Sequence, residues 1–177
     1  SNSEVLQQAN ELGYQGRVIK TLQTFLQHAR AQRPSRDLLE AGAKDERSKM
    51  FLELFFPIYE AYQETLATLG RPDFSELIHG GADQLLSGEV EVPYTHVMID
   101  EFQDISHDRY RLIEAIRTMK PKTEMTYVGD DWQAIYAFAG SDVSIMRNLS
   151  KPKFDRKRVD LGDTFRMPQS LADIASD

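Results

Sequence analysis

The chain has 177 residues, of which 41% are hydrophobic and 28% charged, and its formal net charge is −7. This length fits one ordinary domain or two small lobes with a hydrophobic core, and the acidic total argues against tight, charge-driven nucleic-acid binding by this chain alone. Because there is no cysteine, a disulfide scaffold, a thiol nucleophile, a zinc–thiolate site and an iron–sulfur cluster are excluded.

Residues 1–90 carry the punctuation of helices and contain no convincing strand. Apolar residues at helical spacing predict a first helix that Pro34 stops. Ser48 is predicted to cap a longer helix, which Pro57 kinks or breaks in two and which ends at Gly70.

A third helix is predicted after Asp73, because Asp73 and Glu76 have the spacing of a capping box, and Gly88 ends it. The helix before it is rich in aromatic residues between Phe51 and Tyr62, which could be taken for a base-stacking surface. Their spacing is that of a core face, so packing is the favoured interpretation. No chemistry is predicted for this half of the chain.

From Val92 onward short apolar runs replace the helical pattern. Residues 97–99 are predicted to form a buried strand that ends abruptly in Asp100 and Glu101. Residues 125–128 are predicted to form a second strand, which also ends in acidic residues.

One helix and a third strand complete the predicted pattern. Ser106 is predicted to cap a helix that stops at Pro121, between the first two strands. Residues 159–161 predict a weaker third strand, followed by a helix that begins near Pro168. This order predicts a doubly wound α/β arrangement, in which ligands bind outside the carboxyl edge of a parallel sheet.

The pair Asp100 and Glu101 is a weak signal by itself, because many strands end in acidic residues. In nucleotide hydrolysis such a pair has a specific use: the first carboxylate holds Mg²⁺, usually through water, and the second orients or deprotonates the attacking water. The surrounding sequence favours this use in nucleotide hydrolysis. Three runs of residues support it: 98–104 (MIDEFQD), 128–142 (VGDDWQAIYAFAGSD) and 163–166 (DTFR).

These runs, in this order, resemble motifs II (Walker B), III and IV of the UvrD/Rep-type superfamily 1 DNA helicases, and of their bacterial helicase IV branch in particular. The resemblance implies part of a RecA-like, parallel-sheet motor domain of the P-loop NTPase type. Residues 1–90 would be a helical insert like subdomain 1B, residues 91–150 part of motor domain 1A, and residues 151–177 the start of motor domain 2A.

The resemblance implies ATP and Mg²⁺ as cofactors and gives roles to individual residues. Asp100 and Glu101 would serve the metal, and Glu101 would also be the general base toward water. Gln133 matches the motif III glutamine that senses the γ-phosphate and links it to DNA contacts. Arg166 would stabilise charge on the γ-phosphate across the domain cleft, and Phe165 stands where the family often stacks a tyrosine on adenine.

Single-stranded DNA would pass along Tyr136 and Phe138. Phe138 stands where many relatives have a tryptophan on which a base stacks, and Tyr136 lies beside it in the sequence. For Tyr136 and Trp132, packing of the loop is an equally good interpretation. Ala139 replaces an arginine of many relatives, so one contact of the family pattern is missing.

Other polar residues beside the motifs receive a structural interpretation. Asp130 and Asp131 are predicted to cap the short helix that follows rather than to bind metal. Gln103 and Asp104 are predicted to fix their loop by hydrogen bonds. Three histidines have no metal-ligand spacing and are interpreted as structural or exposed: His79, His96 and His107.

The implied activity is that of an ATP-driven 3′-to-5′ translocase of the bacterial cytoplasm, which binds single-stranded DNA and duplex junctions, unwinds DNA and serves DNA repair. No Gly-Lys-Ser/Thr loop occurs in the chain, although that loop supplies most of the phosphate binding. With a start at Ser1 that resembles a tag remnant, this predicts an internal fragment that is inactive alone. No run approaches the roughly 20 apolar residues of a membrane span, so no membrane partner is expected.

Two other functions stay open at this point. A magnesium-dependent phosphatase or nuclease would use Asp100, Glu101, Asp104 and Asp130 as a carboxylate cluster. It explains the acidic residues but not the glutamine and arginine of the second and third runs. A non-catalytic helical interaction module is favoured by the helical half and by the missing phosphate loop.

Overall fold

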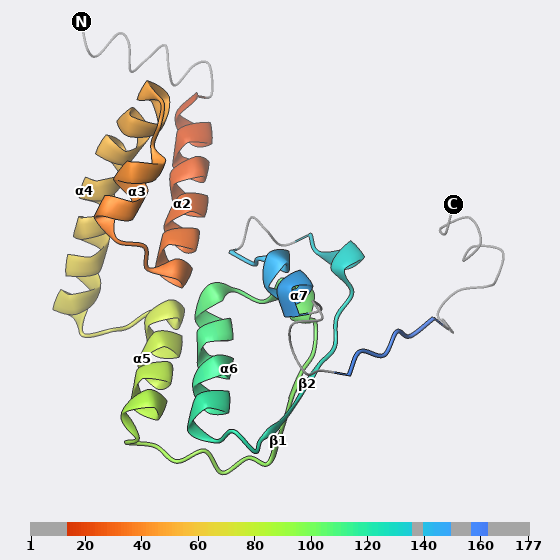
Figure 1. The fold of residues 1–177 in the computed structure, drawn as a ribbon. Helices are drawn as coiled ribbons and strands as arrows, with labels where there is room; N and C mark the ends of the chain where they lie inside the picture. The colour runs from red at the N-terminus through yellow and green to blue at the C-terminus, as the bar shows by residue number, and fades with distance from the viewer. Residues whose placement is uncertain (1–13, 136–139, 150–156, 163–177) are drawn as a thin grey trace, which may run out of the picture.

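The computed structural model describes residues 14–135, 140–149 and 157–162 (Figure 1). The N-terminal half consists of helices α2 (Tyr14–Gln32), α3 (Arg36–Gly42), α4 (Glu46–Leu69) and α5 (Phe74–Ser87). After it come β1 (His96–Ile99), η1 (Phe102–Asp104), α6 (His107–Met119), β2 (Glu124–Tyr127), η2 (Asp131–Gln133) and α7 (Val143–Leu149), where η marks a single 3₁₀ turn. The predicted α/β class, with a helical half before a parallel sheet, is confirmed. None of the described helices has the length and apolarity of a membrane span.

Helix α2 ends where the sequence predicts, whereas α4 differs from the prediction at Pro57 and at its start. As predicted, α2 ends before Pro34. Of the two effects predicted for Pro57, a kink or a break, the break is wrong, because α4 continues through this residue from Glu46 to Leu69. A proline in a helix interior costs about 3 kcal/mol. Burial of the neighbouring Phe55 and Phe56 offsets that cost by packing the turn against α2 and α3.

The start of α4 differs from the prediction. The helix begins after Asp45, not at Ser48, and Asp45 Oδ1 accepts a hydrogen bond from the backbone N–H of Ser48 at 2.9 Å. Hydrogen bonds from the backbone N–H and the hydroxyl of Ser48 hold the pKa of Asp45 below its usual value.

Helix α3 was not predicted. It has seven residues, too few to show periodicity, and its cap is Ser35, which accepts from the N–H of Leu38 at 3.2 Å.

The aromatic run of α4 forms a core, as predicted. Phe55 is 1% exposed, and its ring meets that of Phe25 edge-on with centroids 4.6 Å apart. Tyr59 stacks on Phe55 at 5.4 Å. Full burial of such a side chain contributes roughly 1.5–3 kcal/mol. These rings therefore stabilise the helical half and leave Phe55 unavailable to a nucleic-acid base.

Helix α5 lies alongside α6, as Figure 1 shows. The predicted cap is confirmed, because Asp73 Oδ1 accepts from the N–H of Glu76 at 3.0 Å and Gly88 ends the helix in the left-handed conformation. Ala82 is fully buried, and a Cβ on Gly81 would stand 3.8 Å from the side chain of Leu112. Gly81 therefore lies in the contact between the two helices, where a methyl group would also fit.

A buried carboxylate fixes α5 to the start of α6. Asp108 is 4% exposed and accepts a hydrogen bond from the hydroxyl of Ser75 at 2.9 Å. The hydroxyl of Ser106 also donates to Asp108. Ser106 occupies the N-cap position of α6, as predicted. Its hydroxyl, however, does not accept a hydrogen bond from a backbone N–H of the helix. The helical half is in this way tied to the segment between η1 and α6.

The strands β1 and β2 form a parallel pair whose register runs from His96 opposite Glu124 to Ile99 opposite Tyr127, with α6 as the crossover. One face packs on an apolar cluster, whose buried members are Phe102, Ile105, Ile113 and Ile145. The opposite face of β1 carries Met98, which is 77% exposed. The expected burial on both faces is therefore absent from the described part of the chain.

The predicted third strand is wrong. Residues 157–162 have no regular secondary structure, and the side chains of Val159 and Leu161 are 67% and 86% exposed. An alternating apolar run forms a strand only when a neighbouring strand supplies hydrogen-bond partners. None of the described segments pairs with this one. The helix predicted near Pro168 lies outside the described residues.

Candidate active site

The candidate site lies at the carboxyl edge of the sheet, where β1 and β2 end side by side. Beyond the last register pair, the N–H of Val128 donates to the carbonyl of Ile99 at 2.8 Å. The N–H of Phe102 donates to the carbonyl of Val128, also at 2.8 Å. Because these bonds hold both strand exits together, Asp100 and Glu101 stand next to the turn that leaves β2.

Glu101 adopts a left-handed backbone conformation with φ 50° and ψ 42°. For a residue other than glycine this costs roughly 1–3 kcal/mol, and such residues cluster at active sites. Its N–H is held by Asp100 Oδ1 at 2.9 Å. The turn leaves Asp100 and Glu101 exposed and sends the next two residues, Phe102 and Gln103, into the interior.

Gln103 joins the two strand exits through its side-chain amide. Its Nε2 donates to Glu101 Oε2 at 2.6 Å, and its Oε1 accepts from the N–H of Asp130 at 3.0 Å. The predicted hydrogen-bonding role of Gln103 is thus confirmed. For Asp104 the described structure gives no such bond to Oδ1, which is buried without a partner.

The turn after β2 is organised by Asp130. Its Oδ1 accepts from the N–H of Trp132 at 3.1 Å, and its Oδ2 accepts from Gln133 Nε2 at 2.7 Å. Asp130 is therefore the predicted cap. Asp131 is not a cap, because its Oδ2 pairs with Arg147 Nε of α7 at 3.1 Å. Trp132 projects from this turn and is 94% exposed.

The far end of the segment that follows Gln133 is fixed beside α6. The N–H of Asp142 donates to the carbonyl of Ile105 at 2.9 Å, and Asp142 Oδ2 pairs with His107 Nε2 at 2.9 Å. Burial opposes ionisation of Asp142, but hydrogen bonds from Ser144 and His107 hold its pKa below the usual value. His107 thus has the structural role that was predicted.

Three of the predicted site residues lie within the described structure: Asp100, Glu101 and Gln133. They share one edge of the sheet, and Gln103 and Asp130 connect them by hydrogen bonds. The other four lie outside the described residues: Tyr136, Phe138, Phe165 and Arg166. The sequence alone predicts only a hydrogen-bonding role for Gln103 in its own loop, because its contact with Asp130 spans 27 residues.

The two exposed carboxylates fit a magnesium ion, which in nucleotide sites takes one or two protein carboxylates together with phosphate oxygens and water. Among the residues described, no three His, Asp or Glu side chains form a group that could hold a metal by themselves. Asp130 is engaged by Gln133, and one oxygen of Asp104 is buried. The four-carboxylate cluster that a phosphatase or nuclease would need is not assembled.

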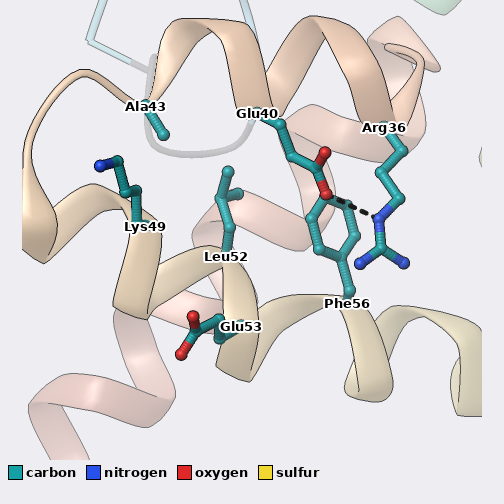
Figure 2. Close-up of a pocket in the computed structure, with 7 residues that line it drawn as sticks. All are labelled: Arg36, Glu40, Ala43, Lys49, Leu52, Glu53 and Phe56. Carbon is teal, nitrogen blue, oxygen red and sulfur yellow. Dashed lines mark hydrogen bonds and ion pairs between the residues drawn. The ribbon is translucent and has the colours of Figure 1, made fainter.

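A pocket of about 320 Å³ lies between α3 and α4, away from the strand exits (Figure 2). Arg36 lines one end of it, with its Nε 2.8 Å from Glu40 Oε1 and its guanidinium 4.3 Å from the ring centroid of Phe56. The remaining residues around it are Ala43, Lys49, Leu52 and Glu53. None of the predicted site residues lines this pocket.

The known proteins to which this chain is similar include DNA helicases. Residues 3–153 match the family model of the UvrD/REP helicase N-terminal domain. The chain is 34% identical over 139 residues to DNA helicase IV of Escherichia coli (strain K12), covering 77% of this chain and 20% of that protein. It is 29% identical over 133 residues to the ATP-dependent DNA helicase UvrD1 of Mycobacterium leprae (strain TN), covering 67% of this chain and 17% of that protein. The chain thus spans about a fifth of the length of these relatives.

Proposed function

Because the chain belongs to the UvrD/REP helicase family, we propose that it is an internal segment of an ATP-dependent DNA helicase. The enzyme moves 3′ to 5′ on single-stranded DNA, unwinds duplex DNA and serves DNA repair. The observation that supports this most directly is the shared sheet edge, where the exposed Asp100 and Glu101 stand beside the turn that carries Gln133. Residues 1–90, 91–150 and 151–177 are assigned to subdomain 1B, motor domain 1A and the start of motor domain 2A.

Hydrolysis in this proposal depends on the two carboxylates that follow β1. When bound, Mg²⁺ would neutralise charge on the phosphate oxygens of the nucleotide. Asp100 would hold the ion, together with Glu101. Glu101 also orients the attacking water and accepts its proton. The buried turn behind Glu101 suits this role, since a base is effective only when it is held in place.

The remaining predicted residues link hydrolysis to DNA. Gln133 senses the γ-phosphate, and Arg166 stabilises charge on it once the two motor domains close. Phe165 stacks on adenine. Tyr136 and Phe138 contact bases of the single strand, because aromatic faces accept any base.

The test is ATP hydrolysis by the longer protein that joins this segment to a phosphate-binding loop. We expect Mg²⁺-dependent hydrolysis that rises with single-stranded DNA, and unwinding of duplexes with a 3′ but not a 5′ tail. The 177-residue chain by itself should show no turnover, because it has no Gly-Lys-Ser/Thr loop. DNA-independent phosphate release from a simple ester would instead support the phosphatase alternative.

Replacing Gln133 by alanine should uncouple hydrolysis from DNA. Coupling between two sites is typically worth about 5- to 150-fold, so we expect stimulation by single-stranded DNA to fall at least about 5-fold. The basal rate should stay nearer to the original. The measurement is ATPase rate against DNA concentration, with Gln84→Ala, an exposed glutamine of α5, as the control. Unchanged stimulation in Gln133→Ala would remove this role.

A further inference from the structure

We propose that Gln103 is a positioning residue that holds the carboxylate of the catalytic base Glu101 and couples it to the turn carrying Gln133. The inference rests on the proposed function, in which Glu101 acts on water. It adds a residue that does not itself touch the reacting atoms.

The hydrogen bonds of Gln103 fix the orientation of its amide. An ionised carboxylate only accepts and a backbone N–H only donates. Nε2 must therefore face Glu101, at 2.6 Å, and Oε1 must face the N–H of Asp130, at 3.0 Å. Glutamate at this position could still accept from Asp130 but would place a second negative charge against Glu101. Glutamine is thus the residue that serves both neighbours.

Burial makes this arrangement rigid. Gln103 is 2% exposed, whereas Glu101 is exposed at the strand exit. A free glutamate side chain loses up to about 1.5–2 kcal/mol of rotamer entropy when it is ordered. The bond from a buried amide selects one orientation of the carboxylate before the reaction begins. An apolar replacement would leave the N–H of Asp130 and one oxygen of Glu101 without this partner.

Gly129 allows the two strand exits to come this close. A Cβ at position 129 would lie 2.7 Å from Gln103 Oε1, 3.0 Å from the backbone nitrogen of Phe102 and 3.1 Å from that of Gln103. The 2.7 Å separation is shorter than real Cβ contacts, so a side chain at 129 would have to displace the amide of Gln103, and the two backbone nitrogens would have to give by a few tenths of an ångström. A side chain at this position would therefore disturb the close approach of the strand exits.

The hydrogen bonds of Gln103 are linked through Asp130 to Gln133. Asp130 donates its N–H to Gln103, and its carboxylate accepts from the amide of Gln133 at 2.7 Å. A series of three hydrogen bonds therefore runs from Glu101 through Gln103 and Asp130 to Gln133. Movement of Gln133 toward a phosphate would act on the backbone that Gln103 holds, and so on the base.

The experiment is a double-mutant cycle in the longer, ATP-hydrolysing protein. Gln103→Met, which has a similar length but no amide, is measured alone and together with Glu101→Gln. We expect kcat to fall about 10-fold or more, the range typical of residues that orient a catalytic group, with little change in KM for ATP. In the Glu101→Gln background the same change should have almost no further effect. Thr123→Val is the control, because it removes a buried hydrogen bond to the Tyr94 carbonyl far from the strand exits.

The outcomes separate the two proposals. No DNA-stimulated hydrolysis in the unsubstituted protein overturns the proposed function and this role with it. An active protein in which Gln103→Met keeps normal kcat, or loses the same factor in both backgrounds, overturns this role alone. If Gln103→Met unfolds early in thermal melting, Gln103→Glu and Gly129→Ala replace it in the cycle. Each should lower kcat only while Glu101 is present.

Discussion

Replacing Arg166 by alanine is expected to lower the rate of ATP hydrolysis about 10³-fold or more in the longer protein. An arginine aimed at the γ-phosphate acts mainly in the transition state, where such residues are worth about 10³- to 10⁵-fold. ATP binding should change much less, because in the proposed function the arginine would reach the phosphate only when the motor domains close. The measurement is steady-state phosphate release, together with the binding of a non-hydrolysable ATP analogue.

A matched control lies eight residues earlier in the chain. Arg158 is an exposed cation whose Nε lies 2.7 Å from Asp160 Oδ1, and Arg158→Ala should leave hydrolysis unchanged. Arg166→Lys should restore only part of the rate, since lysine keeps the charge but lacks the planar fork of donors. Normal turnover in Arg166→Ala would exclude this residue from the hydrolytic site.

Replacing Glu101 by glutamine is expected to lower hydrolysis about 10²-fold or more, the usual effect of losing a positioned base. The substituted side chain keeps its shape, and its carbonyl oxygen can still accept from Gln103. ATP binding should therefore remain, because Asp100 would still serve the metal in the proposed function. Single-turnover hydrolysis and ATP-analogue binding measure the two effects separately.

The control for this change is Glu124→Gln, at the opposite end of the sheet. Glu124 is exposed and pairs with His96 at 3.1 Å, at the amino end of β2. Its substitution removes a similar carboxylate without touching the strand exits, so hydrolysis should be preserved. A Glu101→Gln protein that loses binding and turnover by the same factor would show that Glu101 is structural.

The hydrogen bond between Gln103 and Asp130 affects how substitutions of Gln103 and Gln133 combine. Both Gln103 and Gln133 are linked to Asp130, so their substitutions are not expected to act independently. Residues in one hydrogen-bond network commonly couple by about 0.5–3 kcal/mol. Arg166 enters from a different segment, and its effect should be closer to additive with that of Gln103.

The sequence by itself determined the features that depend on neighbours in the chain. Pro34 stopped α2, Asp73 capped α5, and β1 ended where Asp100 follows its apolar run. These signals are local, since a missing N–H, a short side chain beside a helix start or a change of polarity acts within a few residues. The three motif runs are also local features of the sequence, and they indicate the family without any tertiary contact.

Tertiary packing decided what local signals could not. Proline at position 57 is tolerated in α4 because Phe55 and Phe56 are buried against other helices. Residues 159–161 have the composition of a strand, but no described strand lies beside them.

The joining of the site was decided in the same way. Gln103 and Asp130 are 27 residues apart, and parallel pairing of β1 and β2 with a glycine at 129 is what brings them together. Spacing along the chain carries no information about such a contact, because the crossover helix, and not the sequence distance, sets where the two strand exits meet.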